Sequence, residues 1–388
     1  MVKEEVLDLG KFDPEFEHAL DITDPSMLDI GKIDIYMLRG MMAEMKKAVP
    51  RSLPPPGVLE QDIQIPTRGG AEITLRIYTP EKRPADGCPI YVNYHGGGFL
   101  LGDLESDEIY CRNYVKEQGF VVVSVDYRLA PEHKFPTPVH DAYDALKWVA
   151  ANFTTSLLHG NPAKGFLIGG ASAGGNLSAV CAHLARDEAL QPALTGVHLM
   201  IPSLFAPSAC PPQHAHKLRS IDQCADNPVL SLATMKNFKR HYAADLDSHL
   251  FSVIKWPGGH GGLPPHYFQV CGADMLRDEA LVYETVLREE WGVQTQLKVY
   301  PGMPHGFWAV WPDMVASRRF VREMGEGVEW LRGFAEESGE EEVEEMQETA
   351  SADVEKAVHP ALVAAADVKG KKMNEWNLLS HPFFLAFC

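Results

Sequence analysis

Long apolar runs and paired cysteines are both missing from this sequence. None of the 388 residues belongs to an apolar run of the ~18 residues that a membrane-spanning helix needs, so no membrane span is expected. The acidic N-terminus is interrupted by Pro14, which argues against a secretory signal peptide. The seven cysteines are scattered without a CxxC pair, so we expect reduced thiols in the cytoplasm rather than a disulfide framework.

Positive charge is also scarce. The chain has 35 Lys and Arg against 53 Asp and Glu, a formal net charge of −18, which disfavours nucleic acid or an anionic membrane surface as a partner. Part of the excess is local, because eight glutamates and no Lys or Arg lie between Glu336 and Glu348. We therefore expect residues 336–388 to form an acidic and partly disordered C-terminal extension, with the last core helix ending near Phe334.

Motifs that bind nucleotides or metals are absent as well. There is no GxGxxG after a strand, no Walker loop and no HExxH, so no cofactor is expected. The GGHGG run at 258–262 suggests a metal site through His260 and His266. Two histidines without a third ligand are more typical of loop residues, so no metal is expected either.

What the sequence does contain is an alternation of strand-like and helix-like segments. Helical spacing occurs at 141–153, 176–190, 278–292 and 318–334. The first two strand-like runs alternate in polarity and suggest an edge hairpin, whereas the later runs are continuously apolar, as in strands buried on both faces of a parallel sheet. Strand-like runs lie at residues 61–67, 72–79, 89–95, 120–128, 165–172, 197–203, 266–274 and 295–301. The pattern predicts an α/β fold with a mostly parallel, eight-stranded sheet flanked by helices, within a core of residues 56–335.

Two segments depart from this alternation. Residues 1–55 carry a helical pattern that ends at a proline-rich stop, and residues 204–262 are rich in Pro, His and Gly. Both are predicted to form a helical cap over the strand ends, where ligands bind in open α/β sheets. Tyr36, Met37 and Met41 lie at near-helical spacing and are expected to line an adaptable substrate pocket; the alternative is a helix that packs this stripe on the core.

Glycine is concentrated in two motifs. Residues 170–174, GASAG, match GxSxG between a buried strand and a helix, which predicts that Ser172 sits on a strained nucleophile turn. Acyl transfer also needs N–H donors for a developing oxyanion. One donor is expected from Ala173, and the others from the His95–Gly98 loop, HGGG, where side chains would collide with substrate.

An acid and a base must follow the serine in that chain order. Asp274 stands at the end of a buried strand, and His305 lies in the loop after the next strand. Asp278, four residues after Asp274, is the more natural cap of the following helix. The spacing therefore predicts Ser172, Asp274 and His305 as a catalytic triad.

These motifs, in this order, carry a family resemblance. HGGG, DYRLAPEHKFP (126–136), GASAGGN, DMLRDE and PHGF resemble the hormone-sensitive-lipase-like α/β-hydrolases over about residues 60–335. The resemblance implies the α/β-hydrolase fold and the same triad. It further implies that Gly97, Gly98 and Ala173 donate to the oxyanion and that His95 and Gly96 shape the loop, with Asp126, Arg128 and Glu132 as scaffold. The sequence departs from the family at Ala171, where members often have Asp.

The resulting hypothesis is a cofactor-free serine carboxylesterase. The resemblance implies a small-molecule ester of short to medium acyl chain as substrate, and a homodimer formed through a sheet edge. Two alternatives remain open: a small-molecule receptor on the same fold, against which the presence of His305 argues, and a lyase-type relative that uses the same pocket.

Overall fold

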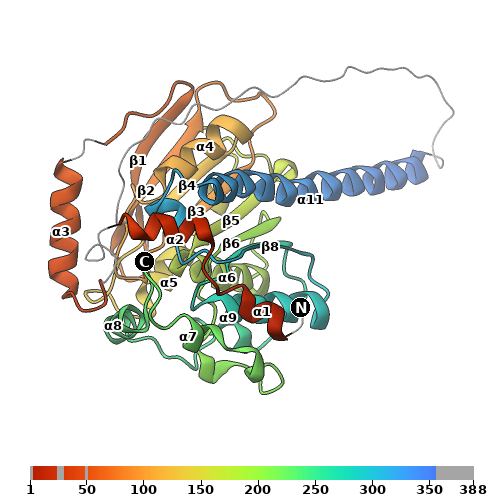
Figure 1. The fold of residues 1–388 in the computed structure, drawn as a ribbon. Helices are drawn as coiled ribbons and strands as arrows, with labels where there is room; N and C mark the ends of the chain where they lie inside the picture. Colours follow the sequence, from red (N-terminus) through yellow and green to blue (C-terminus); the bar gives the residue numbers. More distant parts are fainter. Residues whose placement is uncertain (1–2, 24–29, 49–50, 355–388) are drawn as a thin grey trace.

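An eight-stranded, mostly parallel sheet forms the centre of the protein (Figure 1). The structure, a computed structural model, describes residues 3–23, 30–48 and 51–354. All eight predicted strands are present, in the spatial order β1-β2-β4-β3-β5-β6-β7-β8. The strands are β1 (Val58–Pro66), β2 (Glu72–Pro80), β3 (Ile90–Tyr94), β4 (Val121–Asp126), β5 (Phe166–Ala171), β6 (Gly196–Met200), β7 (His266–Cys271) and β8 (Thr295–Tyr300).

The antiparallel part of the sheet is the predicted edge hairpin. β1 pairs with β2 from Val58 opposite Pro80 to Pro66 opposite Glu72, and β2 pairs antiparallel with β4. From β4 onward every pairing is parallel. All residues of β3, β5, β6 and β7 are buried, which explains why their sequences are apolar without alternation.

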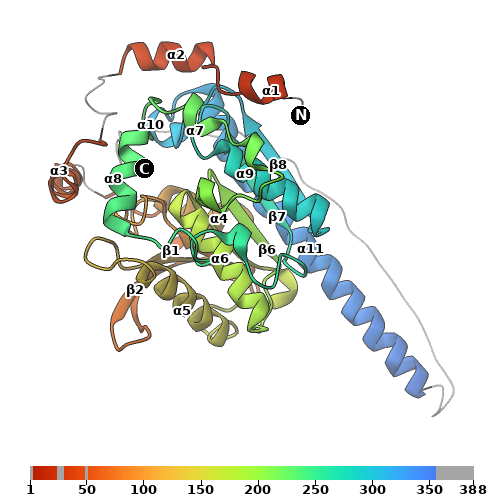
Figure 2. The same cartoon turned by 90° about the horizontal axis from the view of Figure 1, so that it is seen from below.

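Helices cover both faces of the sheet. α4 (Glu108–Gln118) and α11 (Val315–Val354) pack together on one face, and α5 (Thr137–Ala151), α6 (Ala173–Asp187) and α9 (Arg277–Thr285) cover the other (Figures 1 and 2). Shorter helices connect these elements: η2 (Pro162–Lys164), η6 (Val286–Glu290, a π-helical turn) and α10 (Phe307–Val310). Across the described ranges, no helix is both long and apolar enough to cross a bilayer.

The sequence pattern missed one helix and gave a wrong end for another. The pattern did not reveal α4, because its sequence EIYCRNYVKEQ is polar overall, although Cys111, Tyr114 and Val115 are buried against the sheet. The last helix does not end near Phe334 either, since α11 continues through the glutamate run to Val354. That run contains helix-forming Glu, Met, Gln and Ala and no proline, so nothing in it stops a helix. Residues 355–388, including the apolar C-terminal stretch, lie outside the described part of the chain.

The two segments predicted as a cap lie at the carboxyl-end side of the sheet. The N-terminal one contains α1 (Lys3–Asp8), α2 (Pro14–Asp21) and α3 (Ile35–Ala48). α3 stands at the rim of the molecule (Figures 1 and 2), where Arg39 donates to the carbonyl of Leu100 at 2.8 Å and Lys46 pairs with Asp103. Residues 204–262 contain η3 (Pro207–Ala209), η4 (Ala215–Lys217), α7 (Ser220–Gln223), α8 (Leu232–Tyr242) and η5 (Val253–Lys255).

A buried histidine pair joins α6 to the end of this second segment. His183 Nδ1 lies 2.8 Å from the carbonyl oxygen of Ala179 and must therefore carry a hydrogen, so its Nε2 accepts from Nδ1 of His260 at 2.9 Å. Burial lowers the pKa of His260 to about 4 and the pKa of His183 well below its usual value. His266 faces the carbonyl of Pro264 instead. No three His, Cys, Asp or Glu side chains of the described residues cluster as a metal site would require.

This pair predicts a specific loss of stability in acid. Because the folded state holds His260 neutral, the unfolded chain binds its proton first as the pH falls below about 6.5. Stability from this group is complete above that pH and is lost as the pH falls toward 4. Between pH 7 and pH 5 the loss is about 2 kcal/mol for one such histidine. His260→Gln should reduce the pH 7 to pH 5 difference in unfolding free energy, measured with urea, by about that amount.

The control for this measurement is His18, which is exposed on α2. His18→Gln should show the same pH 7 to pH 5 difference as the unmodified protein. An unchanged difference in His260→Gln would show that the pair does not set the acid response.

Candidate active site

Ser172 occupies a strained turn between β5 and α6. Its φ of 54° and ψ of −111° lie outside the regions that non-glycine residues ordinarily adopt. The neighbouring glycines make this turn possible, because a Cβ at Gly174 would overlap the carbonyl oxygen of Tyr94 at the end of β3. The turn therefore holds the Ser172 hydroxyl clear of its own helix and beside the loop that follows β3.

Three side chains form a continuous hydrogen-bonded row. His305 Nδ1 lies 2.7 Å from Oδ2 of Asp274, and His305 Nε2 lies 3.0 Å from Oγ of Ser172. Because Nδ1 faces a carboxylate, it carries the hydrogen, and Nε2 is left as an acceptor for the serine hydroxyl. All three side chains are buried. The structure thus brings together the serine, acid and base that the sequence singled out, from loops after three different strands.

Asp274 and Asp278 have distinct surroundings. The second oxygen of Asp274 accepts from the N–H of Leu276 at 2.9 Å, which fixes the carboxylate in the turn after β7. The expectation that Asp278 caps its own helix is wrong, since α9 already begins at Arg277. Asp278 instead accepts from the N–H groups of Arg219 and Ser220, both at 2.6 Å, and so secures the start of α7.

The His95–Gly98 loop folds back on itself after β3. The N–H groups of Leu100 and Leu101 both bond to the carbonyl of Gly97, at 3.0 and 2.8 Å. Gly97 has a φ of +114°, and a Cβ there would overlap the carbonyl oxygen of Leu101. Within the described residues, the backbone N–H groups of Gly97, Gly98 and Ala173 have no hydrogen-bond acceptor, which leaves three donors free. Gly98 and Ala173 line the same pocket as Ser172; Gly97 lies behind Gly98 in the loop.

His95, the first residue of this loop, is held in place by Tyr127 and by the backbone of Gly96. Its ring stacks on Tyr127 with centroids 4.2 Å apart, and its Nδ1 donates to the carbonyl of Gly96 at 2.7 Å. The Tyr127 hydroxyl donates to the carbonyl of His95 at 2.7 Å. Burial lowers the pKa of His95 to about 4, so the imidazole is neutral near pH 7. These contacts fix the strand end from which the glycine loop departs.

The DYRLAPE stretch is bound into the scaffold as the resemblance implied. Arg128 pairs with the buried Asp141 at 2.7 Å, and Glu132 pairs with Arg39 of α3 at 2.7 Å. Burial raises the pKa of Asp126 to about 6. None of these three lines the pocket beside Ser172.

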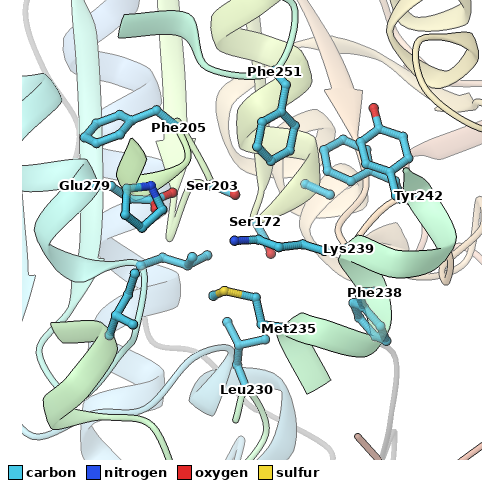
Figure 3. Close-up of a pocket in the computed structure, with 16 residues that line it drawn as sticks. Ser172, Ser203, Phe205, Leu230, Met235, Phe238, Lys239, Tyr242, Phe251 and Glu279 are labelled. Carbon is cyan, nitrogen blue, oxygen red and sulfur yellow. The ribbon is translucent and has the colours of Figure 1, made fainter. Parts of the chain in front are cut away.

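A pocket of about 640 Å³, counted with its open mouth, lies above Ser172 (Figure 3). Its floor is formed by core residues, and most of its wall comes from the 204–262 segment. Met235, Phe238 and Tyr242 enter it from α8 (Figure 3). Two ionisable side chains other than the row described above, Lys239 and Glu279, also line it. Ser203 adds a hydroxyl, and the rest of the wall is apolar, from Phe99, Phe205, Pro207, Ile221, Leu230, Phe251 and Leu276.

The structure does not bring Tyr36, Met37 and Met41 to this pocket, contrary to expectation. Their side chains are 57%, 64% and 48% exposed, because α3 turns Ile35 and Leu38 inward instead. The methionine in the wall is Met235, from the other cap segment. The signal missed in the sequence was the helical spacing of Met235, Phe238 and Tyr242.

Comparison with known proteins agrees with this geometry. A family model described as alpha/beta hydrolase fold matches residues 91–309. An AB hydrolase superfamily protein of Schizosaccharomyces pombe is 39% identical over 83% of this chain and 94% of its own length. Versiconal hemiacetal acetate esterase of Dothistroma septosporum is 34% identical over 76% of this chain and 88% of its own length. The solved structure of vibralactone cyclase superposes with a TM-score of 0.77 at 32% identity, over 84% of this chain and 97% of that one. With its eight-stranded sheet and its motifs in order, the chain belongs to the hormone-sensitive-lipase-like carboxylesterase family of α/β-hydrolases.

Proposed function

We propose that the protein hydrolyses carboxylic esters of short to medium acyl chain through an acyl-enzyme on Ser172. The observation that carries the proposal is the hydrogen-bonded row of Ser172, His305 and Asp274, which opens into an apolar pocket beside unpaired backbone N–H groups. This arrangement joins a nucleophile, a base oriented by a third group, and donors for an oxyanion.

The first half of the reaction acylates the serine. His305 Nε2 takes the hydroxyl proton as Ser172 Oγ attacks the ester carbonyl, and the negative charge that develops on the carbonyl oxygen is met by N–H groups of the glycine loop and of Ala173. Asp274 keeps the proton on Nδ1 and stabilises the imidazolium. The tetrahedral intermediate then expels the alcohol, which receives the proton from His305.

The second half of the reaction hydrolyses the acyl-enzyme and regenerates Ser172. A water molecule gives a proton to His305 and attacks the acyl carbon, and the resulting intermediate expels Ser172, which regains its proton as the acid departs. The wall formed by residues 204–262 is mainly apolar, which suits the hydrocarbon chain of a short to medium acyl group. We take this segment as the cap of the enzyme.

A second candidate function is acyl transfer to a hydroxyl of the substrate itself, which closes a ring instead of adding water. The likeness to vibralactone cyclase and the apolar wall favour it. Product mass separates the two reactions, because hydrolysis adds one water to the ester and ring closure does not. The same measurement with a β-acyloxy substrate detects elimination by a lyase-type reaction.

The triad proposal predicts a large loss of activity when any of its three residues is replaced. Ser172→Ala and His305→Ala should each reduce ester hydrolysis to near background, since the residues act as a unit and their losses do not add. Asp274→Asn should lower kcat by about 10⁴-fold, because an amide no longer holds the proton on Nδ1 of His305. Initial rates with 4-nitrophenyl butyrate, together with circular dichroism for folding, provide the measurement.

Asp278→Asn is the matched control for the acid. It removes a carboxylate that secures α7, so it should lower the unfolding temperature while the folded enzyme keeps its kcat within a few-fold. If Asp278→Asn abolished activity and Asp274→Asn did not, the assignment of the acid would be wrong.

The glycine loop predicts a separate effect on rate. Gly97→Ala forces a Cβ onto the Leu101 carbonyl at a positive φ and should displace the loop's donors. We expect kcat to fall by about 10- to 1,000-fold, with KM changed less, because the donors act mainly in the transition state. Gly40→Ala in α3 meets no atom within 4 Å and should leave both constants unchanged. A change confined to KM in Gly97→Ala would instead make this loop a wall of the pocket.

A further inference from the structure

Lys239 is a cation in a pocket whose wall is otherwise mainly apolar. It belongs to α8, between Phe238 and Tyr242, and lines the cavity above Ser172. Figure 3 shows its side chain extending from the helix, with the nitrogen directed toward the middle of the cavity, where Ser172 lies. A lysine at a protein surface ordinarily directs its ammonium to water. Here the aliphatic stem crosses the wall and carries the charge inward.

The ammonium group has no anionic partner among the described residues. No carboxylate oxygen there lies within 4.0 Å of its nitrogen, and no hydrogen bond from it is formed within the same part of the chain. Other lysines of the protein do find such partners; Lys255, for example, pairs with Asp247 at 2.7 Å. A charge directed into an apolar pocket without a partner costs free energy that a bound anion would offset.

Among the described residues, Glu279 is the carboxyl group that lines the pocket together with Lys239. Its Oε1 accepts from the N–H of Leu204 at 2.6 Å, which directs that oxygen toward the backbone rather than toward Lys239. Burial raises the pKa of Glu279 to about 8, although Lys239 and the Leu204 N–H act in the opposite direction. Burial therefore disfavours the charged form of this carboxyl, and Glu279 forms no ion pair with Lys239 within 4.0 Å.

We propose that Lys239 selects esters that carry a carboxylate in their acyl or alcohol part, such as half-esters of dicarboxylic acids. The inference rests on the proposed ester hydrolysis at Ser172 and names its substrate class. The carboxylate would pair with the ammonium while the ester carbonyl lies against Ser172, and the apolar wall would contact the chain between the two groups. A charge-assisted hydrogen bond against a mainly apolar wall supplies the discrimination.

The test compares esters that match in length and differ in charge. On the acyl side, mono-4-nitrophenyl adipate is compared with 4-nitrophenyl hexanoate; on the alcohol side, 4-acetoxybenzoate is compared with 4-tolyl acetate. Lys239→Met should lower the anionic-to-neutral ratio of kcat/KM by about 10- to 100-fold for at least one pair, mainly through KM, since the lost hydrogen bond is to a charged group and is made in ground and transition state alike. The pair that responds identifies the side of the ester that reaches Lys239.

Two further variants separate a specific charge from a change in packing. Lys239→Arg should preserve most of the preference, because it keeps the positive charge. Lys236→Met removes an exposed lysine of the same helix and should leave the ratio unchanged. A ratio that is the same in Lys239→Met as in the unmodified protein, for both pairs, overturns the inference while ester hydrolysis at Ser172 stands.

Failure of the proposed function gives a different result. If the unmodified protein hydrolyses none of the four esters, the hydrolase proposal fails, and calorimetry with adipate and hexanoate then tests the inference alone. Tighter binding of adipate that is lost in Lys239→Met supports the anion site, and equal binding of the two acids overturns it.

Discussion

The close approach of two neighbouring strand ends is the constraint on which the site depends. β3 and β5 pair in parallel, and the turn after β5 is pressed against the last carbonyls of β3 so closely that a side chain at Gly174 would collide with Tyr94. This contact lifts Ser172 into its strained conformation and sets the glycine loop beside it. Because both strands are buried on both faces, the sheet holds this strain without local unfolding. The acid and base then need only short loops after β7 and β8 to reach the serine.

Charge is distributed very differently over the whole chain and within the pocket. The sequence carries a net charge of −18, yet among the described residues a lysine, Lys239, lines the pocket beside Ser172, and burial raises the pKa of the nearby Glu279. Burial also lowers the pKa values of His95 and His260, so both imidazoles are neutral near pH 7 and act as fixed hydrogen-bonding groups. Among the histidines that the structure describes, His305 is the one with a carboxylate at one nitrogen and a hydroxyl at the other. Hydrogen-bond partners, rather than residue type, separate the reactive imidazole from the structural ones.

The sequence was informative where a residue's environment is determined locally. Buried parallel strands need apolar residues at every position and the edge hairpin alternates in polarity, so all eight strands were predictable. The turn geometry at Ser172 and Gly97 permits few residue types. Prediction failed where the environment of a side chain depends on which distant part of the chain packs against its helix. α3 and α8 both carry a methionine and aromatic stripe, and only their tertiary placement exposes Tyr36 and brings Met235 to the pocket. Asp278 looked like a cap for its own helix, but the backbone N–H groups that its carboxylate accepts from lie 58 and 59 residues away along the chain. α4 was missed because a helix that packs one narrow face on a sheet can be polar elsewhere.

The close contact between Gly98 and Phe238 links the shape of the pocket to the position of the glycine loop. A Cβ at Gly98 would overlap the Phe238 ring, so α8 packs directly on bare backbone of the glycine loop. The helix and the loop therefore cannot move independently at this contact. A larger or differently shaped side chain in place of Phe238 would displace the backbone of the loop. A substitution at position 238 should therefore change both the wall of the pocket and the position of the glycine loop beside Ser172.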